Sequence, residues 1–523
     1  MARVFRARLI AASAALALAG GGSAWAENLA DAIALAYQTN PTIAAERANL
    51  RFLEETYVQA RAGYRPSVTG QSTLDYIWNG SRGASPAQET NTATALVQVT
   101  QPIYTGGRVT SAVRAAEADI LAERETLRQT EADVLQQVIQ AYVNVRRDQQ
   151  AIRIGQDNVA VLTRQVQETR VRFEVGEVTK TDVAQSEAEL AQSQAALATA
   201  HAQLAIDRAA YAQVVGQSPG DLEPEPSLKL PATIDEAFDR AQRYNPNIRS
   251  AEYGRQGASA RLAGAKAQRM PRVQLNGQFG FRTDQGLRAI PTEADNFRQF
   301  SQVTATVTQP LFAGGSIDSG IRQAVERENF FAIQLEGARR NTVQSLSQFW
   351  NQLLSARANI AANEERVRAA RVAVEGARAE QAVGLRTTLE VLTAEQTMRD
   401  AELALVNARR DEYVASAGVL NVTGQLAANN IVAALPLDPG GHSFTRLKKA
   451  SGYVPWEEAV KAFDSVGGAP DVDFLPPPPD EPLVTTAPGQ GANLGATGPT
   501  GKAAPSAPTP PPAPNLPPVP PKR

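Results

Sequence analysis

The sequence predicts an α+β membrane protein: a trimeric 12-stranded β-barrel with four strands per chain, continued by a long α-helical coiled-coil tunnel and built from two internal repeats. Three observations favour this class. The two halves of the chain repeat the same motifs, each half contains paired stretches of alternating polarity, and each half then continues as a very long helical pattern.

The first 26 residues have the three-part pattern of a secretory signal peptide. Three arginines precede the apolar run Leu9–Ala19, and small residues surround a cut before Glu27. We therefore expect residues 1–26 to be removed on export. Further along, no stretch reaches the roughly 20 apolar residues that a membrane-spanning helix needs, so a crossing of a membrane must use strands.

An internal duplication divides the rest of the chain. Thr100–Arg108 returns as Thr308–Ser316, and Val175–Gly176 returns as Val383–Gly384, each 208 residues later. Because this period is far longer than a solenoid unit, each copy must be a large module that packs beside its twin. We assign the first repeat to residues 27–216, the linker to 217–231 and the second repeat to 232–424.

Each repeat begins with an Ala-rich helical pattern, Leu29–Ala62 or Thr233–Gln268, that Asn-Pro interrupts after its first turns. The residue before a proline favours extended backbone, so we expect a break there. In each repeat, one pair of amphipathic strands follows. In the second repeat, apolar residues alternate with Gln274, Asn276 and Gln278. Such segments of about ten residues are typical of transmembrane barrel strands, although the pattern alone also fits two hairpins of a soluble sandwich.

Polar loops at Asn79–Asn91 and Thr283–Asn296 are expected to join the strands of each pair. After Gly106–Gly107, and again after Gly314–Gly315, the hydrophobic period becomes helical. A helix over the proline-free segment that follows Gly107 could reach about 100 Å at about 1.5 Å per residue. The next helix of each repeat carries a seven-residue spacing, which predicts a left-handed coiled-coil rod.

The C-terminal region has two parts. Residues 425–466 are mixed in character, with a short helix expected at Trp456–Phe463. Residues 467–523 hold more than half of the 33 prolines of the chain. Such a composition cannot bury a core, so we expect this tail to be disordered.

Composition excludes several classes of function. The chain has no cysteine, which excludes disulfides and thiolate metal sites. It has only two histidines, which argues against histidine-based catalysis. No cluster of nucleophile, base and acid occurs at usable spacing, and we predict neither an enzyme nor a cofactor. The net charge of −2 gives no basic face for nucleic acid.

Four strands cannot close a barrel, because about eight are the minimum and eight leave an interior filled by side chains. The chain must therefore oligomerise. Three copies would supply enough strands for an aqueous lumen, and we predict that Gln274, Asn276 and Gln278 line it.

Together these features resemble the TolC family of outer-membrane efflux and secretion channels. The resemblance covers Glu27 to Phe463 and rests on the duplicated module, on Tyr64–Ser67 before the first strand, and on two repeated motifs. These motifs are Gln-Pro-Ile/Leu-Tyr/Phe-x-Gly-Gly at the strand exits and Val-Gly-x-x-Thr-x-x-Asp/Glu-Val at the hairpin tips. Gly216–Gly220 and Leu437–Pro439 are similar to the branch that serves type I protein secretion.

The resemblance implies a homotrimer in outer-membrane lipid that extends into the periplasm of a Gram-negative bacterium. The linker 217–231 and the segment 425–466 would form an equatorial belt. A periplasmic adaptor (membrane fusion protein) would connect the channel to an inner-membrane ABC exporter. The adaptor would dock at the hairpin tips, at Val175, Gly176, Val383 and Gly384.

The resemblance also implies a periplasmic gate at these tips. Matched residue by residue, Thr181 and Asp182 would link to Arg386 across neighbouring helix pairs, and Glu390 would form an acidic constriction. The family's second acidic ring falls here on Thr393, and the aromatic partner of the link falls on Gln381. The alternative for Arg386 and Glu390 is an ordinary solvated pair on a helix surface.

Two other functions remain open from the sequence. The same scaffold serves as the outer component of a tripartite drug-efflux pump. Long helical hairpins also occur in periplasmic coiled-coil adaptors, but those would not need two strand pairs with one polar and one apolar face. The type I secretion channel is the leading prediction.

Overall fold

The structure is a computed structural model, and it describes residues 27–80, 88–283, 297–432, 454–479 and 482–483. The predicted signal peptide, Leu437–Pro439 and most of the tail lie outside these residues. Each repeat has the same element order. The first contains α2 (Leu29–Thr39), α3 (Pro41–Arg61), η1 (Ala62–Tyr64), β1 (Ser67–Asn79), β2 (Gln88–Tyr104), α4 (Arg108–Glu174) and α5 (Lys180–Val215).

The second repeat contains α6 (Ile234–Tyr244), α7 (Pro246–Lys266), η2 (Ala267–Arg269), β3 (Arg272–Thr283), β4 (Arg298–Thr308), α8 (Ser316–Ala382) and α9 (Thr388–Val422). Two short helices follow, α10 (Ala428–Ile431) and α12 (Glu457–Asp464). The predicted long helices are confirmed, since α4 and α8 each run for 67 residues. Among the described residues, no helix is long and apolar enough to cross a membrane.

The predicted Asn-Pro breaks are confirmed in both repeats. Asn40 ends α2 and caps α3, and Asn245 does the same between α6 and α7. Each asparagine also donates from its side-chain amide to the end of the repeat's last helix, Asn40 to the Val214 carbonyl at 3.0 Å and Asn245 to the Val422 carbonyl at 2.8 Å. In each repeat, the asparagine at the break therefore attaches the two N-terminal helices to the end of the repeat's last helix.

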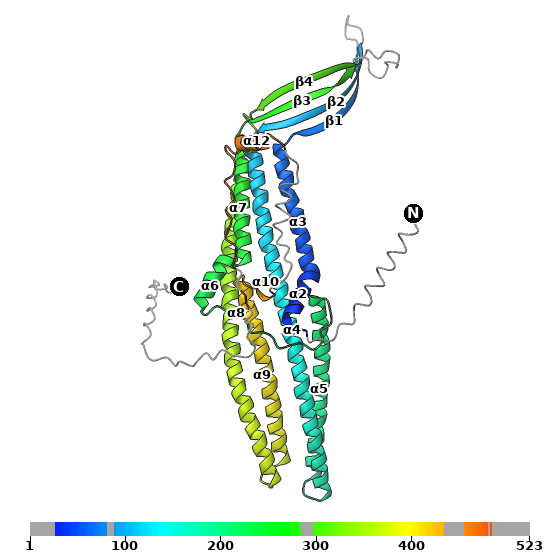
Figure 1. Cartoon of the computed structure of the whole chain (residues 1–523), viewed down its shortest axis with the longest axis vertical. Coiled ribbons are helices and arrows are strands. Elements are labelled where there is room, and N and C mark those ends of the chain that lie inside the picture. Colours follow the sequence, from blue (N-terminus) through cyan, green and yellow to red (C-terminus); the bar gives the residue numbers. More distant parts are fainter. Residues whose placement is uncertain (1–26, 81–87, 284–296, 433–453, 480–481, 484–523) are drawn as a thin grey trace, which may run out of the picture. The chain divides into compact units, whose positions relative to one another are not determined.

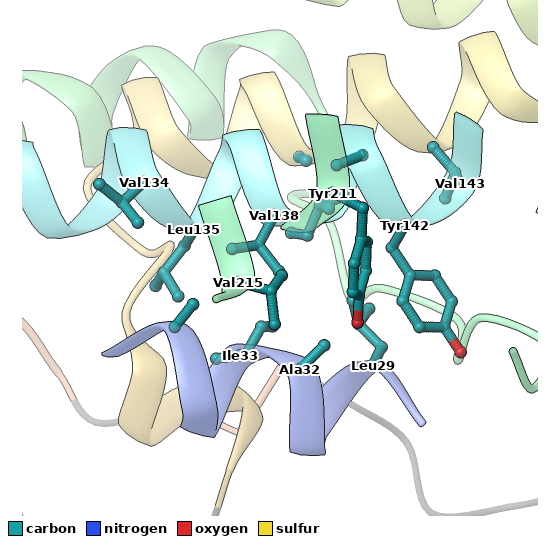
Figure 2. Packing of buried hydrophobic residues seen from close by; sticks show 14 of the residues in the cluster. Leu29, Ala32, Ile33, Val134, Leu135, Val138, Tyr142, Val143, Tyr211 and Val215 are labelled. Carbon is teal, nitrogen blue, oxygen red and sulfur yellow. The ribbon is translucent and has the colours of Figure 1, made fainter. Parts of the chain in front are cut away.

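Helix α4 is the centre of the helical packing. It lies against α5 of its own hairpin, against α3 and α7, and along part of α9, while α8 packs on α7 and α9 (Figure 1). A buried cluster joins α2, α4 and α5 near the chain's linker. Figure 2 shows Ile33 of α2 on the side of the helix that faces Val138 of α4 and Val215 of α5, while Leu29 of α2 lies beside Tyr211 of α5.

The four strands form one antiparallel sheet in the order β1-β2-β3-β4. The strands of the first pair reach further into the predicted loop than expected, because β2 begins at Gln88. Residues 81–87 and 284–296, which hold most of the two predicted loops, lie outside the described residues. In the order of the sheet, β1 and β4 pair on one side only.

The expectation of disorder from Gly467 is wrong for the part of the tail that the structure describes. Ala469, Val472 and Leu483 are buried at 8%, 7% and 1% exposure. Arg249 of α7, itself buried, donates to the carbonyls of Leu475 and Pro476. Composition did not predict this, because the segment has no core of its own and uses the helix surfaces of the two repeats instead.

Helix α12 docks where the first strand pair meets the helices. Glu457 forms ion pairs with Arg61, the last residue of α3, and with Arg65, which follows η1. Asp464, fully buried, accepts hydrogen bonds at the start of α4 from the backbone N–H groups of Thr105, Gly107 and Thr110. Since α4 has no side-chain cap from its own N-cap residue Gly107, the carboxylate supplies one.

Candidate functional site: the hairpin tips and the faces of the sheet

The tips of the two helical hairpins have the same backbone geometry. Gly176 and Gly384 adopt left-handed φ angles of 81° and 78°, which a residue with a Cβ rarely accepts. The preceding valines lie at the surface, with Val175 68% and Val383 70% exposed. Each tip therefore presents a tight turn with an exposed apolar side chain beside it.

Asp182 and Glu390 occupy equivalent positions in two capping boxes. The Asp182 carboxylate accepts from the Thr179 N–H at 2.8 Å, and the Thr179 hydroxyl accepts from the Asp182 N–H at 3.3 Å. Glu390 repeats this arrangement with Thr387, at 2.9 and 3.3 Å. Thr179 and Thr387 thus start α5 and α9.

The hairpin-tip motif found in the sequence contains these threonines, but the sequence analysis did not predict their capping role, although their spacing carried the signal. Thr-x-x-Asp/Glu before a helical run is the signature of a capping box. The hydrogen bond from the Thr387 N–H lowers the pKa of Glu390 below its ordinary value. A carboxyl with a lowered folded pKa stabilises the fold above its unfolded pKa, and this contribution is lost as pH falls through the folded pKa. Glu390 is therefore charged near neutral pH.

Arg386 forms an ion pair within its own hairpin tip, with Glu380 at the end of α8. Hydrogen bonding to that carboxylate raises the pKa of Arg386. On the first turn of α5, Thr181 is exposed and Asp182 is partly exposed. In the described part of the single chain, Arg386 and Asp182 form no ion pair with each other, so the predicted link is not an intrachain contact.

The residues aligned with the family's other gate positions have local partners as well. The Gln381 amide donates to the Thr388 hydroxyl at 3.3 Å, and the Thr393 hydroxyl donates to the Leu389 carbonyl at 2.9 Å. Within the described residues, no group of three or more acidic or histidine side chains could hold a metal ion.

The register of the sheet aligns one polar and one apolar face across all four strands. Asn276 pairs with Thr100 on one side and Thr304 on the other, while Gln278 pairs with Gln98 and Gln302. The Thr100 hydroxyl donates to the Asn276 side-chain oxygen at 3.0 Å. On this face Gln274 lies one step further, between Pro102 and Thr306.

The opposite face is apolar and exposed. Val68 is opposite Val99, and Val273 is opposite Val307. The exposed fractions of these positions are large for aliphatic side chains, 64% for Val68 and 67% for Val307. A soluble sandwich would bury this face against a second sheet. In the described chain the four strands form one sheet, and its apolar face stays open.

An open sheet of this kind, continued by two hairpins of very long helices, defines the class of outer-membrane channels with a helical periplasmic extension. The profile of the family described as "Outer membrane efflux protein" matches residues 32–217 and 237–425, one block for each repeat. The chain belongs to this family. Its members are transport conduits of the Gram-negative outer membrane, and the family resemblance drawn from the sequence is confirmed.

Curated relatives carry two kinds of description. The chain is 32% identical to outer membrane efflux protein BepC of Brucella suis, covering 82% of this chain and 93% of BepC. It is 24% identical to outer membrane protein TolC of Vibrio cholerae, covering 78% and 93%. It is also 25% identical to alkaline protease secretion protein AprF of Pseudomonas aeruginosa, covering 78% and 88%.

Among solved structures, the outer membrane protein VceC of Vibrio cholerae has the same fold. The TM-score is 0.66 at 21% sequence identity, and the match covers 76% of this chain and 96% of VceC. The predicted fold class, strands of a barrel continued by a helical tunnel, is thereby confirmed.

Proposed function

We propose that three copies of this chain form the outer-membrane exit channel of a type I protein secretion system, gated at its periplasmic helix tips. The open sheet carries the proposal. Strands β1 and β4 each leave one edge unpaired, and unpaired backbone groups do not occur at a lipid-exposed edge. Further copies must close the barrel, and three copies leave space for a polar lumen.

The internal repeat supports a specific contact between copies. Gly257 of α7 approaches α4 so closely that a Cβ there would lie 3.5 Å from the Cβ of Ala118. In the internal repeat, Phe52 on α3 is equivalent to Gly257, and Glu326 on α8 is equivalent to Ala118. Both are exposed in the single chain, Phe52 by 68%. We expect Phe52 of one copy to lie beside Glu326 of the next.

Engineered cysteines test this arrangement on a background without cysteine. A separation of about 3.5 Å between Cβ atoms is within the range that a disulfide spans. Phe52→Cys combined with Glu326→Cys should give a reducible covalent trimer on denaturing gels, while each single variant should remain monomeric. A ladder that ends at a dimer, from folded protein, would contradict closure by three copies.

The gate proposal concerns Asp182, Thr181 and Arg386 at neighbouring hairpin tips. Thr181 and Arg386 are exposed and Asp182 is partly exposed, and within the described residues the ion pair of Arg386 is with its own Glu380. Arg386→Ser or Asp182→Ala should raise single-channel conductance in planar bilayers, because threefold symmetry removes three links at once. Glu380→Gln breaks the intrachain pair alone, and Thr179→Ala breaks the cap but keeps the Asp182 carboxylate. If these control variants raise the single-channel conductance as much as Arg386→Ser and Asp182→Ala do, the gate proposal is wrong.

Three copies of Glu390 would place three carboxylates around one constriction and attract cations there. Glu390→Gln should reduce cation preference and weaken block by multivalent cations. Thr387→Ala is the matched control, because it disturbs the same capping box and leaves the charge in place. If both variants change selectivity equally, the effect comes from fraying of α9.

Protein secretion and drug efflux require different inner-membrane partners. Similarity to a protease secretion protein and the Gly216–Gly220 sequence favour secretion, and the higher identity to BepC favours efflux as the second candidate. A photo-crosslinking residue at Val175 or Val383 in intact cells should capture an adaptor at the tips formed with Gly176 and Gly384. Co-purification of an ABC exporter supports secretion. A proton-driven pump in its place would overturn it.

A further inference from the structure

Helix α12 has an unusual distribution of residues. Its buried side carries Glu457, Val460 and Asp464, of which two are acidic and bind groups at the strand–helix junction. Its exposed side carries aromatic residues. Trp456 is 48% exposed and Phe463 is 68% exposed. Because their spacing of seven residues is close to two helical turns, these two side chains lie along one stripe.

Val466, just after the helix, extends this apolar surface and is 68% exposed. A second exposed stripe is polar and contains Glu458 and Lys461. Along its outer surface the helix is therefore amphipathic. A helix that buries its acids and exposes two aromatic residues is favoured where the surroundings are themselves partly apolar.

A hydrogen bond connects this surface to the apolar face of the sheet. The Trp456 indole N–H donates to the side-chain oxygen of Gln101 at 2.9 Å. Gln101 alternates in register with Val99 and Val97, so it belongs to the apolar face, at the end nearest the helices. Val97 and Val99 are themselves exposed. Helix α12, of which Trp456 is the N-cap, lies where the strands meet the long helices (Figure 1). Through its hydrogen bond to Gln101, Trp456 continues the apolar face of the sheet at this end.

The second repeat has exposed apolar residues at the corresponding positions, where the part of the chain that the structure describes contains no helix like α12. There Leu311 and Phe312 are 93% and 92% exposed. Their first-repeat equivalents, Ile103 and Tyr104, are only partly exposed, and the Tyr104 hydroxyl donates to the Val466 carbonyl at 3.4 Å. In the first repeat, α12 partly covers Ile103 and Tyr104 and exposes Trp456 and Phe463 instead. An apolar surface is therefore present at the ends of the strands in both repeats.

We propose that the segment Trp456–Val466 is a membrane-interface anchor that contacts phospholipid of the periplasmic leaflet of the outer membrane. Tryptophan is enriched at membrane interfaces because its ring is apolar and its N–H is polar. The anchor is tied to the channel by Asp464 and Glu457, so lipid contact would hold the strand–helix junction of the first repeat at the membrane surface. The alternative partner for this exposed surface is a second copy of the chain, and the experiment must distinguish it from lipid.

Tryptophan fluorescence separates them in the intact protein. In the exported chain, from which we expect residues 1–26 and with them Trp25 to be removed, replacement of Trp78 and Trp350 by Phe leaves Trp456 as the only tryptophan. The trimer is placed in phosphatidylcholine vesicles that contain lipid brominated near the headgroup or near the chain end. Headgroup-proximal bromine should quench Trp456 at least about twofold more strongly than chain-end bromine. A matched variant that keeps only Trp350, in the helical region, should be quenched by neither.

Quenching of Trp456 no stronger than that of Trp350 overturns the proposal. A second measurement covers the case in which the double substitution weakens folding. A photo-crosslinking residue at Phe463 in otherwise unchanged protein should yield a lipid adduct in cells. A dimer band instead would assign the surface to a neighbouring copy and contradict the anchor.

Discussion

The buried carboxylate of Asp464 binds Thr110, which lies 354 residues earlier in the chain, through both the backbone N–H and the hydroxyl at 3.1 Å. The same carboxylate accepts from the backbone N–H of Thr105 at 2.6 Å and of Gly107 at 3.1 Å. In the second repeat the residue equivalent to Thr110 is itself an acid, Asp318, which forms an ion pair with Arg269. Within the described residues, the C-terminal helix α12 thus caps the long helix of the first repeat.

Replacing this acid should destabilise the chain strongly. In Asp464→Ala, three backbone N–H groups at the start of α4 lose their partner, and leaving buried donors unsatisfied should cost about 3 kcal/mol or more in total. The measurement is the free energy of unfolding in detergent by urea titration. Glu458→Ala, on the exposed side of the same helix, is the control and should change it by less than about 0.5 kcal/mol. Equal effects would contradict the capping role.

The alternation of the sheet can be tested with two adjacent substitutions on β4. Val303 is 74% exposed on the apolar face, and Thr304 faces Asn276 on the polar face. Val303→Arg should impair outer-membrane assembly at about 2–4 kcal/mol near the midplane, and Thr304→Arg should be tolerated. Heat-resistant trimer in membrane fractions is the readout. Similar yields from both variants would mean that the apolar face does not contact lipid.

The packed part of the tail makes a prediction about truncation. A chain that ends after Val466 loses the buried side chains of Val472 and Leu483, each worth about 1.5–3 kcal/mol on full burial. It should unfold at lower urea concentration than a chain that ends after Val484, which keeps all the described contacts. Identical unfolding curves for the two truncated chains would show that the segment contributes no stability.

A pair of carboxyl groups between α3 and α4 predicts a pH effect. Burial, together with hydrogen bonding and charge repulsion from Glu46, raises the pKa of Glu123 to about 7. A hydrogen bond that the Asn49 amide donates to the Glu123 carboxylate at 2.5 Å has a smaller, opposite effect on this pKa. For an acid whose folded pKa is raised, stability is lost as pH rises from the unfolded pKa, about 4.5, through the folded one. Glu123→Gln should therefore raise the melting temperature at pH 8 and leave it nearly unchanged at pH 4.

The sign of that difference is the test. A calorimetric melting series from pH 4 to pH 8 should show the gap between wild type and Glu123→Gln opening as pH rises. Glu364→Gln, at an exposed ion pair with Arg409, is a control for generic loss of charge. A gap that does not depend on pH, or one that opens toward low pH, would contradict the raised pKa.

Much of the fold could be predicted from the sequence because its signals are local. The alternation around Gln274–Gln278 encodes a strand with two faces, and the proline-free run after Gly107 encodes a helix of 67 residues. The 208-residue repeat then doubles each element. Capping boxes at Thr179 and Thr387 were equally local and could have been read from Thr-x-x-Asp/Glu.

The sequence by itself thus determined the repeats, the element types and the membership in an outer-membrane channel class. The tertiary structure alone decided which partners meet across long separations. Asp464 caps α4, and Arg249 donates hydrogen bonds to the carbonyls of Leu475 and Pro476. Periodicity specifies the face of an element, since neighbouring residues set it. A buried ion pair or cap depends on packing between distant segments, which no local pattern records.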